Sequence, residues 1–149
     1  MAARPIPQGY HALTPYLTVQ GAAKLVDFLK KAFGAEQSEL FKRPDGTIAH
    51  TMLQIGDSRL MISDASEKMP ANRSSLYHYV NDVDATFKRA LAAGGKSTMD
   101  VSDMFYGDRV GSLTDPCGNT WTIATHKEDV SAGEVEKRFK AFLQQQKAA

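Results

Sequence analysis

One structural unit occurs twice in this chain. Val19-Gln20-Gly21 is followed by an apolar helical pattern that stops at Gly34, and Val80-Asn81-Asp82 is followed by a second pattern that stops at Gly95. A single offset of 61 residues relates Val19 to Val80 and Gly34 to Gly95. This repeat predicts two halves of one fold, related by internal pseudo-symmetry and placed around a pocket.

The bulk properties are those of an ordinary globular domain. A chain of 149 residues with 42% hydrophobic residues can bury a core without disulfides. The 18 Lys and Arg residues are scattered and balanced by 17 Asp and Glu residues, so we expect no nucleic-acid partner. No apolar run approaches the ~20 residues of a membrane span, and no signal pattern opens the chain. We therefore expect a cytoplasmic protein with no membrane partner.

The first half of the chain predicts a strand, a helix and three further strands. Residues 11–19 alternate as a strand, with Pro15 favouring an edge position. Apolar residues recur at helical spacing from Ala22 to Phe33, and Gly34 ends the helix. Turns at 43–46 and 56–57 then separate strands at 38–42, 47–55 and 59–63.

The second half predicts the same order. A strand at 75–80 leads to a helix that Asp82 caps and Gly94-Gly95 ends. The three remaining strands are expected at 96–101, 108–114 and 119–125. The fold class is therefore α+β, built from two βαβββ modules at 11–63 and 75–125.

The remaining segments flank or join these modules. Residues 1–10 form an arm, the polar stretch 64–74 is a linker, and the main domain covers 11–129. Residues 130–149 contain a charged helix at 132–145, whose apolar stripe suits packing or a dimer contact. Cys117 is the one cysteine, which excludes an internal disulfide and a multi-cysteine zinc site. It lies in the turn Asp115-Pro116-Cys117-Gly118.

The paired modules and several motifs resemble one family. The motifs are Asp115-Pro116-x-Gly118-Asn119-x-Trp121, Thr14-Pro15-Tyr16-Leu17, the helix sequence of residues 27–35, and Phe105-Tyr106-Gly107-Asp108-Arg109. They are similar to the vicinal oxygen chelate (VOC) superfamily of glyoxalase I, extradiol dioxygenases, and fosfomycin- and bleomycin-resistance proteins, and most of all to its PhnB-like branch. The resemblance covers residues 14–129 and implies an incomplete barrel with a cavity inside.

The resemblance also implies where a metal would be held. Metal-dependent members carry His, Glu or Gln near the start of the first strand and in the last strand of each module. The matching positions here are Thr14, Met61, Ser75 and Thr122. Neutral hydroxyls and a thioether do not suit a divalent first-row ion. We therefore expect no cofactor, with a divalent metal only if the protein is an enzyme that uses other ligands.

Strand alternation predicts the lining of the cavity. The inward-facing residues are Thr14, Tyr16, Thr18, His50, Met52, Met61, Ser63, Ser75, Tyr77, Tyr79, Thr120 and Thr122. Aromatic and thioether surface with a few hydroxyls suits a small, largely apolar organic ligand. The alternative is that these side chains fill the barrel and leave no usable space.

The four histidines, Tyr106 and Arg109 complete the candidates. His50 is the one plausible general base in the cavity, with no acidic residue predicted beside it. His78 falls on the helix-facing side, as a partly buried and hydrogen-bonded side chain, and His126 is expected outside the barrel, as is His11. Tyr106 and Arg109 can lie at the pocket mouth, where Arg109 would bind a carboxylate or phosphonate. The alternative for Arg109 is an ion pair with neighbouring residues.

These considerations lead to one function and two alternatives. The expected function is metal-free binding of a small organic molecule by a homodimer, the dimer being implied by the resemblance. The candidate ligand-binding residues are Tyr16, His50, Met61, Ser75, Tyr77, Tyr106, Arg109 and Thr122. The first alternative is a metal-dependent enzyme of glyoxalase or dioxygenase type acting on a small carbonyl or aromatic compound. The second is sequestration of an antibiotic such as bleomycin.

Overall fold

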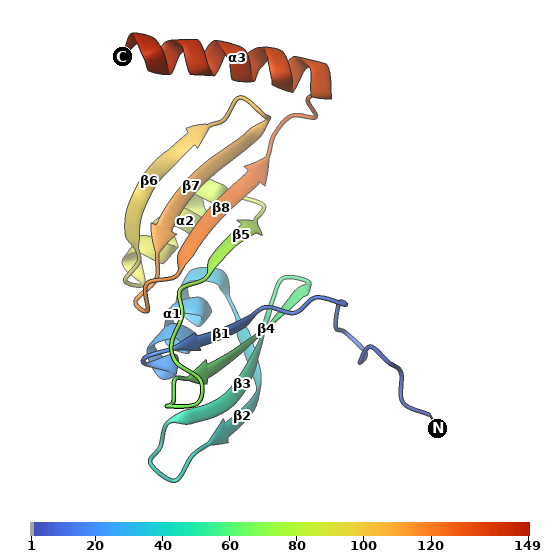
Figure 1. Cartoon of the computed structure of the whole chain (residues 1–149), viewed down its shortest axis with the longest axis vertical. Coiled ribbons are helices and arrows are strands. Elements are labelled where there is room, and N and C mark those ends of the chain that lie inside the picture. Colours follow the sequence, from blue (N-terminus) through green and yellow to red (C-terminus); the bar gives the residue numbers. More distant parts are fainter. Residues whose placement is uncertain (1) are drawn as a thin grey trace.

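The two predicted modules are present, and a C-terminal helix follows them (Figure 1). The computed structural model describes residues 2–149, so Met1, the first residue of the expected arm, lies outside the described residues. The first module consists of β1 (Tyr16–Val19), α1 (Ala22–Phe33), β2 (Glu36–Lys42), β3 (Ile48–Ile55) and β4 (Ser58–Asp64). The second consists of β5 (Ser75–Tyr79), α2 (Val83–Ala92), β6 (Lys96–Asp103), β7 (Asp108–Thr114) and β8 (Thr120–His126). The last helix is α3 (Ala132–Ala148).

Both modules have the same sheet topology. The strand orders are β1-β4-β3-β2 and β5-β8-β7-β6. In each sheet the first strand runs parallel to the last, with Leu17 opposite Ile62 and His78 opposite Ile123, and the other pairs are antiparallel. The first strand of each module therefore lies at a sheet edge, and within residues 2–149 the two sheets do not close into a barrel.

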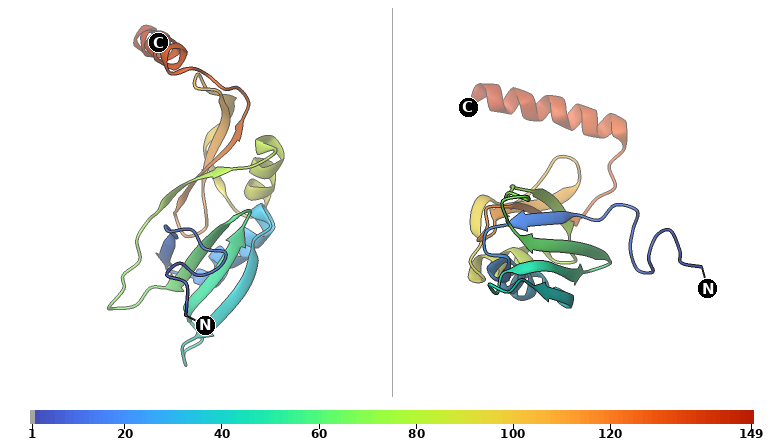
Figure 2. Two further views of the ribbon diagram at one scale, coloured as in Figure 1. Left: turned by 90° about the vertical axis from the view of Figure 1, so that its right-hand side faces the viewer. Right: turned by 60° about the horizontal axis from the view of Figure 1, so that its bottom comes forward.

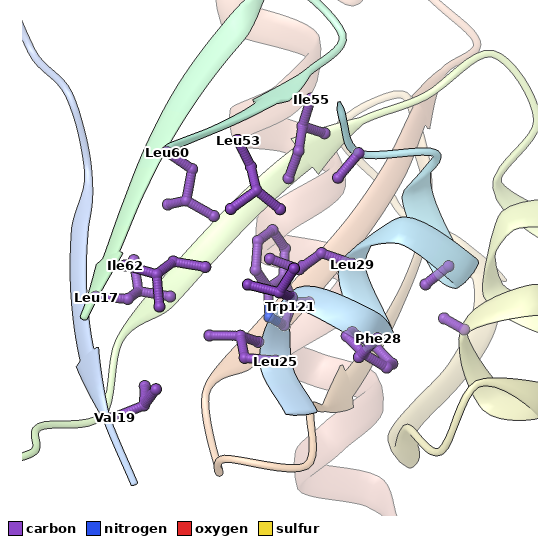
Figure 3. Packing of buried hydrophobic residues seen from close by; sticks show 14 of the residues in the cluster. Leu17, Val19, Leu25, Phe28, Leu29, Leu53, Ile55, Leu60, Ile62 and Trp121 are labelled. Carbon is purple, nitrogen blue, oxygen red and sulfur yellow. The ribbon is translucent and has the colours of Figure 1, made fainter. Parts of the chain in front are cut away.

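A shared hydrophobic core joins the modules. Helices α1 and α2 lie side by side and contact each other (Figure 2). Leu25, Phe28 and Leu29 of α1 are fully buried among strand residues of the first module (Figure 3). Trp121 of β8 belongs to the same cluster, with its ring 5.0 Å from that of Phe33. The helix-facing sides of both sheets are thus covered, and no helix within residues 2–149 covers their opposite sides.

The last strand of each module caps the helix of that module. Gly21, with φ of 89°, precedes α1, and Asp64 accepts hydrogen bonds from the Gly21 and Ala22 amides at 3.1 and 2.8 Å. In the second module, the hydroxyl of Thr125 accepts from the Val83 amide at 2.9 Å. Asp64 and Thr125 are related by the same 61-residue offset as the repeat. Both satisfy amides that a helix leaves unpaired at its N-terminus.

The motif from Asp115 to Trp121 is a buried hydrogen-bond network. The Asp115 carboxylate accepts from the Cys117 and Asn119 amides, from the Asn119 side chain, and from the Trp121 indole at 2.8 Å. Asn119 is fully buried, and its side-chain oxygen accepts from the Ser74 amide at 2.9 Å. The motif therefore fixes the β7–β8 turn and the start of β5.

The structure corrects several expected boundaries. Strand β2 begins at Glu36 and not at residue 38, and α3 ends at Ala148 and not at residue 145. The first strand begins at Tyr16 and not at residue 11, because Pro15 has no amide hydrogen to continue the ladder. Strand β6 runs to Asp103, two residues beyond the predicted end.

Helix α3 lies beyond the β6–β7 end of the second module (Figure 1) and contacts it through residues of its second and third turns. The rings of Phe139 and Phe142 lie 5.6 and 5.3 Å from that of Phe105, and Arg138 forms a two-pronged ion pair with Glu128. No residue of α3 is buried in the described chain. Among residues 2–149, no helix combines the length and the apolar character needed to cross a membrane.

Replacing Asp115 with alanine tests the turn network. Asp115→Ala leaves the Trp121 indole and the Asn119 donors without their acceptor, so we expect the free energy of unfolding to fall by about 3 kcal/mol. Denaturant unfolding measures the change. Asp57→Ala, in the exposed β3–β4 turn, is the control and should stay within about 0.5 kcal/mol of the parent. Equal stability of the two variants would contradict the structural role of the motif.

Candidate functional site

Each sheet has one face that no helix covers. The strand register agrees with the expected alternation: Tyr16 lies opposite Met61, and Met61 opposite Met52. In the second sheet Tyr77 lies opposite Thr122, and Thr122 opposite Ser112. Tyr16, Tyr77 and Tyr79 are 40%, 47% and 61% exposed, so the expected enclosed cavity is two open faces within one chain. We call these the first and second open faces.

His50 lies on the first open face with aromatic neighbours. Its ring lies 6.0 Å from Tyr16 and 6.3 Å from Phe41. Its Nε2 lies 3.7 Å from a Glu39 carboxylate oxygen. The prediction that no acidic residue stands beside His50 is therefore wrong, because the β2–β3 pairing brings Glu39 to the same face. The alternation of side chains in β2 could have indicated this neighbour, because it places Glu39 and Phe41 on the same face of the strand.

The N-terminal arm covers part of this face. Arg59 donates from Nε to the Gly9 carbonyl at 3.0 Å, and its guanidinium lies 4.4 Å from the centre of the Tyr10 ring. A hollow of about 480 Å³ lies between the arm and the sheet. It is lined by Pro5, Ile6, Pro7, Tyr10, His11, Ala12, Thr14, Glu39 and Met61. Ser63, in register with Thr18, is buried, and its hydroxyl has no hydrogen-bond partner among the described residues.

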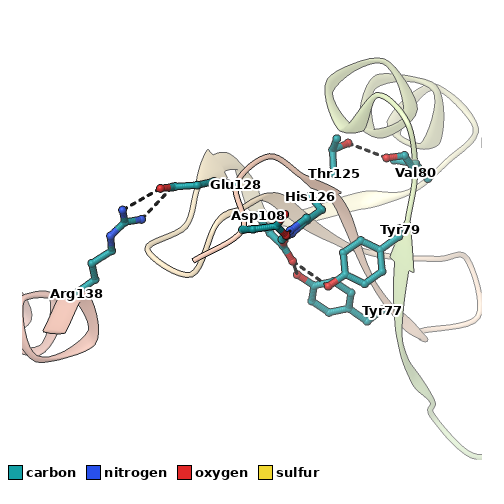
Figure 4. A network of polar contacts seen from close by, with 9 residues as sticks. Tyr77, Tyr79, Val80, Asp108, Thr125, His126, Glu128 and Arg138 are labelled. Carbon is teal, nitrogen blue, oxygen red and sulfur yellow. Dashed lines mark hydrogen bonds and ion pairs between the residues drawn. The ribbon is translucent and has the colours of Figure 1, made fainter. Parts of the chain in front are cut away.

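The second open face holds a denser polar cluster (Figure 4). Both tyrosine hydroxyls of β5 donate to one Asp108 oxygen, Tyr77 at 2.9 Å and Tyr79 at 3.0 Å. The other Asp108 oxygen lies 2.7 Å from His126 Nδ1. His126 Nε2 lies 2.8 Å from an oxygen of Asp129, in the connection to α3. We call these five residues the Asp108 cluster.

Burial and the hydrogen bonds within the Asp108 cluster shift the pKa values of Asp108, His126 and Tyr77. Burial opposes a charge on Asp108, but hydrogen bonds from His126, Tyr77 and Tyr79 lower its pKa nevertheless. Hydrogen bonds to Asp108 and Asp129 raise the pKa of His126. Burial, with Tyr106 and Asp108 nearby, raises the pKa of Tyr77 well above its ordinary value. At neutral pH the carboxylate is charged and both phenols are neutral donors.

This cluster corrects the prediction for His126. The residue was expected outside the barrel, yet it lies on the second open face opposite Asp108. Sequence reasoning ended the last strand at residue 125, whereas β8 continues to His126. The Asp108 pairing could have been inferred only from the register of β7 and β8, which the length of the intervening turn leaves open.

Arg109 lies on the opposite side of the sheet from the cluster. Its guanidinium donates to both oxygens of Asp84 in α2 at 2.8 and 2.9 Å, and to Asp103 at 3.2 Å. Arg109 therefore forms ion pairs with neighbouring residues, which was the alternative to binding a carboxylate or phosphonate ligand. Tyr106 stays near Tyr77, as its effect on the pKa of that phenol indicates.

His78 faces the helices, as predicted, but it is not hydrogen-bonded there. Its ring lies 4.7 Å from Phe33, edge to face, and its buried Nδ1 has no partner in the described chain. Burial lowers the pKa of His78, so the ring is neutral. It lines a hollow of about 280 Å³ between the modules, together with Trp121, β5 and the β3–β4 turn.

The positions implied for a metal do not fit one. Thr122 shares a hydrogen bond with Ser112 at 2.9 Å, and Ser75 lies opposite Thr120 and not opposite Thr122. Met61 and Thr14 add a thioether and a hydroxyl. Such donors carry no charge to balance a divalent ion. Across residues 2–149, no three His, Cys, Asp or Glu side chains come together as a metal site would require.

The charge state of His126 gives a pH-dependent contribution to stability. Folding raises the pKa of His126, so its cluster stabilises the protein fully below the ordinary imidazole pKa of about 6.5 and less as pH rises through the raised value. The charged or titratable groups facing the ring are Asp108, Asp129, Tyr77 and Tyr79. We expect the stability difference between the parent and His126→Gln to shrink from about pH 6 to about pH 9. Denaturant unfolding across that range checks this, and a constant difference would contradict it.

Comparison with known sequences identifies a relative of similar length. The uncharacterised protein Rv0887c of Mycobacterium tuberculosis is 33% identical over 136 residues, covering 84% of this chain and 80% of that protein.

Solved structures share the fold. TnmS3 of Streptomyces sp. CB03234, described as an antibiotic-binding protein, superposes with a TM-score of 0.64 and 21% identity over 78% of this chain and 96% of TnmS3. The PhnB protein of Bacillus cereus gives a TM-score of 0.62 and 20% identity over 77% of this chain and 99% of its own. The profile of the Glyoxalase/Bleomycin resistance protein/Dioxygenase superfamily matches residues 10–123. With both modules in place, the chain belongs to that superfamily, also called the VOC superfamily, and has a PhnB-like structural neighbour.

Proposed function

We propose that this protein binds a small, largely apolar organic molecule on its open sheet faces, without a metal or other cofactor, as a cytoplasmic homodimer. The observation that carries the proposal is the tyrosine pair of the second open face. The Tyr77 and Tyr79 rings lie 5.1 Å apart and are about half exposed, and one buried carboxylate holds both hydroxyls.

The pair is suited to stacking because it is already ordered. Asp108 fixes both hydroxyls, so the rings lose little conformational freedom when a ligand arrives. Exposed aromatic side chains offer large apolar area to a planar ligand. Ser112 and Thr122 supply hydroxyls on the same face as polar handles. A largely apolar surface with a few fixed polar groups is typical of small-molecule sites.

The homodimer is supported by the edges and faces left uncovered. β1 and β5 are edge strands, and the tyrosines within them are exposed. A second copy would cover these edges and bring a first open face against a second one, which turns two shallow surfaces into an enclosed site. Tyr16, His50 and Met61 would then join Ser75, Tyr77, Tyr106 and Thr122 around one ligand.

Antibiotic binding is the second candidate. TnmS3, which shares the fold, is described as an antibiotic-binding protein. Exposed aromatic faces suit the planar rings of many such compounds. In this case binding alone would be the function, and no product would form.

Binding to the tyrosine pair can be tested by titration. We expect protein treated with a chelator to bind planar aromatic compounds in isothermal titration calorimetry, with bleomycin as the antibiotic tested. Tyr77→Leu and Tyr79→Leu should each weaken binding about 5-fold, through loss of about 1 kcal/mol of aromatic stacking. Leu143→Ala, an apolar residue of α3 that is 41% exposed, serves as control. Binding that appears only after adding zinc, nickel or manganese would contradict the metal-free site.

The dimer predicts a mass of twice the 16.3 kDa of one chain. Sedimentation velocity measures it. We expect Tyr16→Glu, which adds a charge to the edge strand β1, to shift the protein toward monomer. Leu91→Glu on α2, where the side chain is 38% exposed, is the matched control and should remain dimeric. A parent protein of single-chain mass would refute the dimer.

A further inference from the structure

One side chain of the Asp108 cluster has a geometry that binding alone does not use. His126 is half exposed and lies between a buried and an open carboxylate. Asp108 is 5% exposed and fixed by three hydrogen bonds, whereas the Asp129 side chain is fully exposed. The first carboxylate is therefore a rigid support, and the second is free to move away.

The rigid support determines which nitrogen of His126 carries a proton. The lowered pKa of Asp108 keeps it ionised, and an ionised carboxylate can only accept hydrogen bonds. Its 2.7 Å contact with Nδ1 therefore requires a proton on Nδ1. When His126 is neutral, the lone pair lies on Nε2.

The lone pair would face an accessible space. An exposed ion pair such as that between Asp129 and His126 contributes about 1 kcal/mol or less, and loss of the imidazole charge removes its attraction. His126 lines a hollow of about 520 Å³ together with Tyr79, Val80, Asn81 and Thr125. A molecule resting on the Tyr79 ring can reach this hollow.

We propose that His126 is a general base, oriented by Asp108, that removes a proton from carbon in a small planar carbonyl or heteroaromatic compound held against Tyr79. The inference rests on the proposed function, because it requires a ligand on the second open face. Asp108 is the positioning residue, since it holds the tautomer and stabilises the imidazolium that forms.

The step balances without a co-reactant. With a carbonyl substrate, Nε2 takes the proton next to the carbonyl group, and the C–H electron pair forms a carbon–carbon double bond. The carbonyl π electrons move to the oxygen, which receives the proton back from Nε2. The net reaction is a tautomerisation, and no electrons are gained or lost.

The test uses 5-nitrobenzisoxazole, a planar heteroaromatic probe for a base. Removal of its ring C–H proton forms a nitrile, breaks the N–O bond and releases a yellow nitrophenolate, with the proton passing to the base and then to water. We expect turnover that rises with pH as His126 loses its proton. His126→Gln should reduce the second-order rate about 100-fold, and Asp108→Asn about 10-fold or more.

The Asp129→Asn variant separates catalysis from a structural role. Loss of the Asp129 charge should move the rise in rate to lower pH, because less attraction holds the proton on His126. His11→Gln, in the N-terminal arm, is the matched histidine control and should match the parent. If the parent protein turned over the probe no faster than His126→Gln, the inference would be overturned.

Two further measurements keep the result unambiguous. The analogue with a methyl group in place of the reactive hydrogen reports binding alone, by NMR shift changes at Tyr77 and Tyr79. If it binds and the probe does not react, the base fails and the proposed function stands; if it does not bind and the probe does not react, both fail. In the parent protein, imidazole nitrogen shifts should show the Nδ1–H tautomer of His126 at high pH, and the opposite tautomer would refute the proposal even if a variant does not fold.

Discussion

Each four-stranded sheet has one helix to cover it, and this constraint shapes the whole molecule. Helices α1 and α2 pack against each other, and the ring of Trp121 in the second sheet reaches Phe33 at the end of α1. One continuous core therefore contains the helix-facing sides of both sheets. No helix of the described chain covers the opposite sides, so Tyr16, Tyr77 and Tyr79 stay exposed. The surfaces proposed for ligands and for a second copy are the direct result of this division.

The two modules use the same architecture for different chemistry. Asp64 and Thr125 cap their helices from equivalent positions, as a carboxylate and a hydroxyl. By the same 61-residue offset, Tyr16 matches Tyr77, but Thr18 stands where the second module has Tyr79, and Ala65 where it has His126. The paired tyrosines and the oriented imidazole thus belong to the second module alone. The duplicated backbone supplies two open faces, and the side chains of the second module give one of them its tyrosine pair and the imidazole held by Asp108.

Predictions of helix α1 and of strand faces, which depended on neighbouring residues in the sequence, were correct, and predictions of neighbours across strand pairs were not. Helix α1 was predicted at its observed bounds, because apolar spacing and Gly34 act within a few residues. The two-faced strands were predicted for the same reason, and the register confirms that Tyr16, Met61 and Met52 share a face. The neighbours of His50 and His126 were mispredicted. Glu39 and Asp108 reach these rings across strand pairs, and a shift of one residue in pairing would move either carboxylate to the other face.

The repeat, the helix stops and the Asp115 turn motif determined the two modules, their order and their family, since these features depend on spacing along the chain. Spacing along the chain does not determine how two modules pack. Burial of α1 and α2 against each other decided that the faces stay open, and strand register decided that one buried carboxylate would hold two phenols and an imidazole. Packing and register join residues far apart in sequence, so the folded chain alone specifies them.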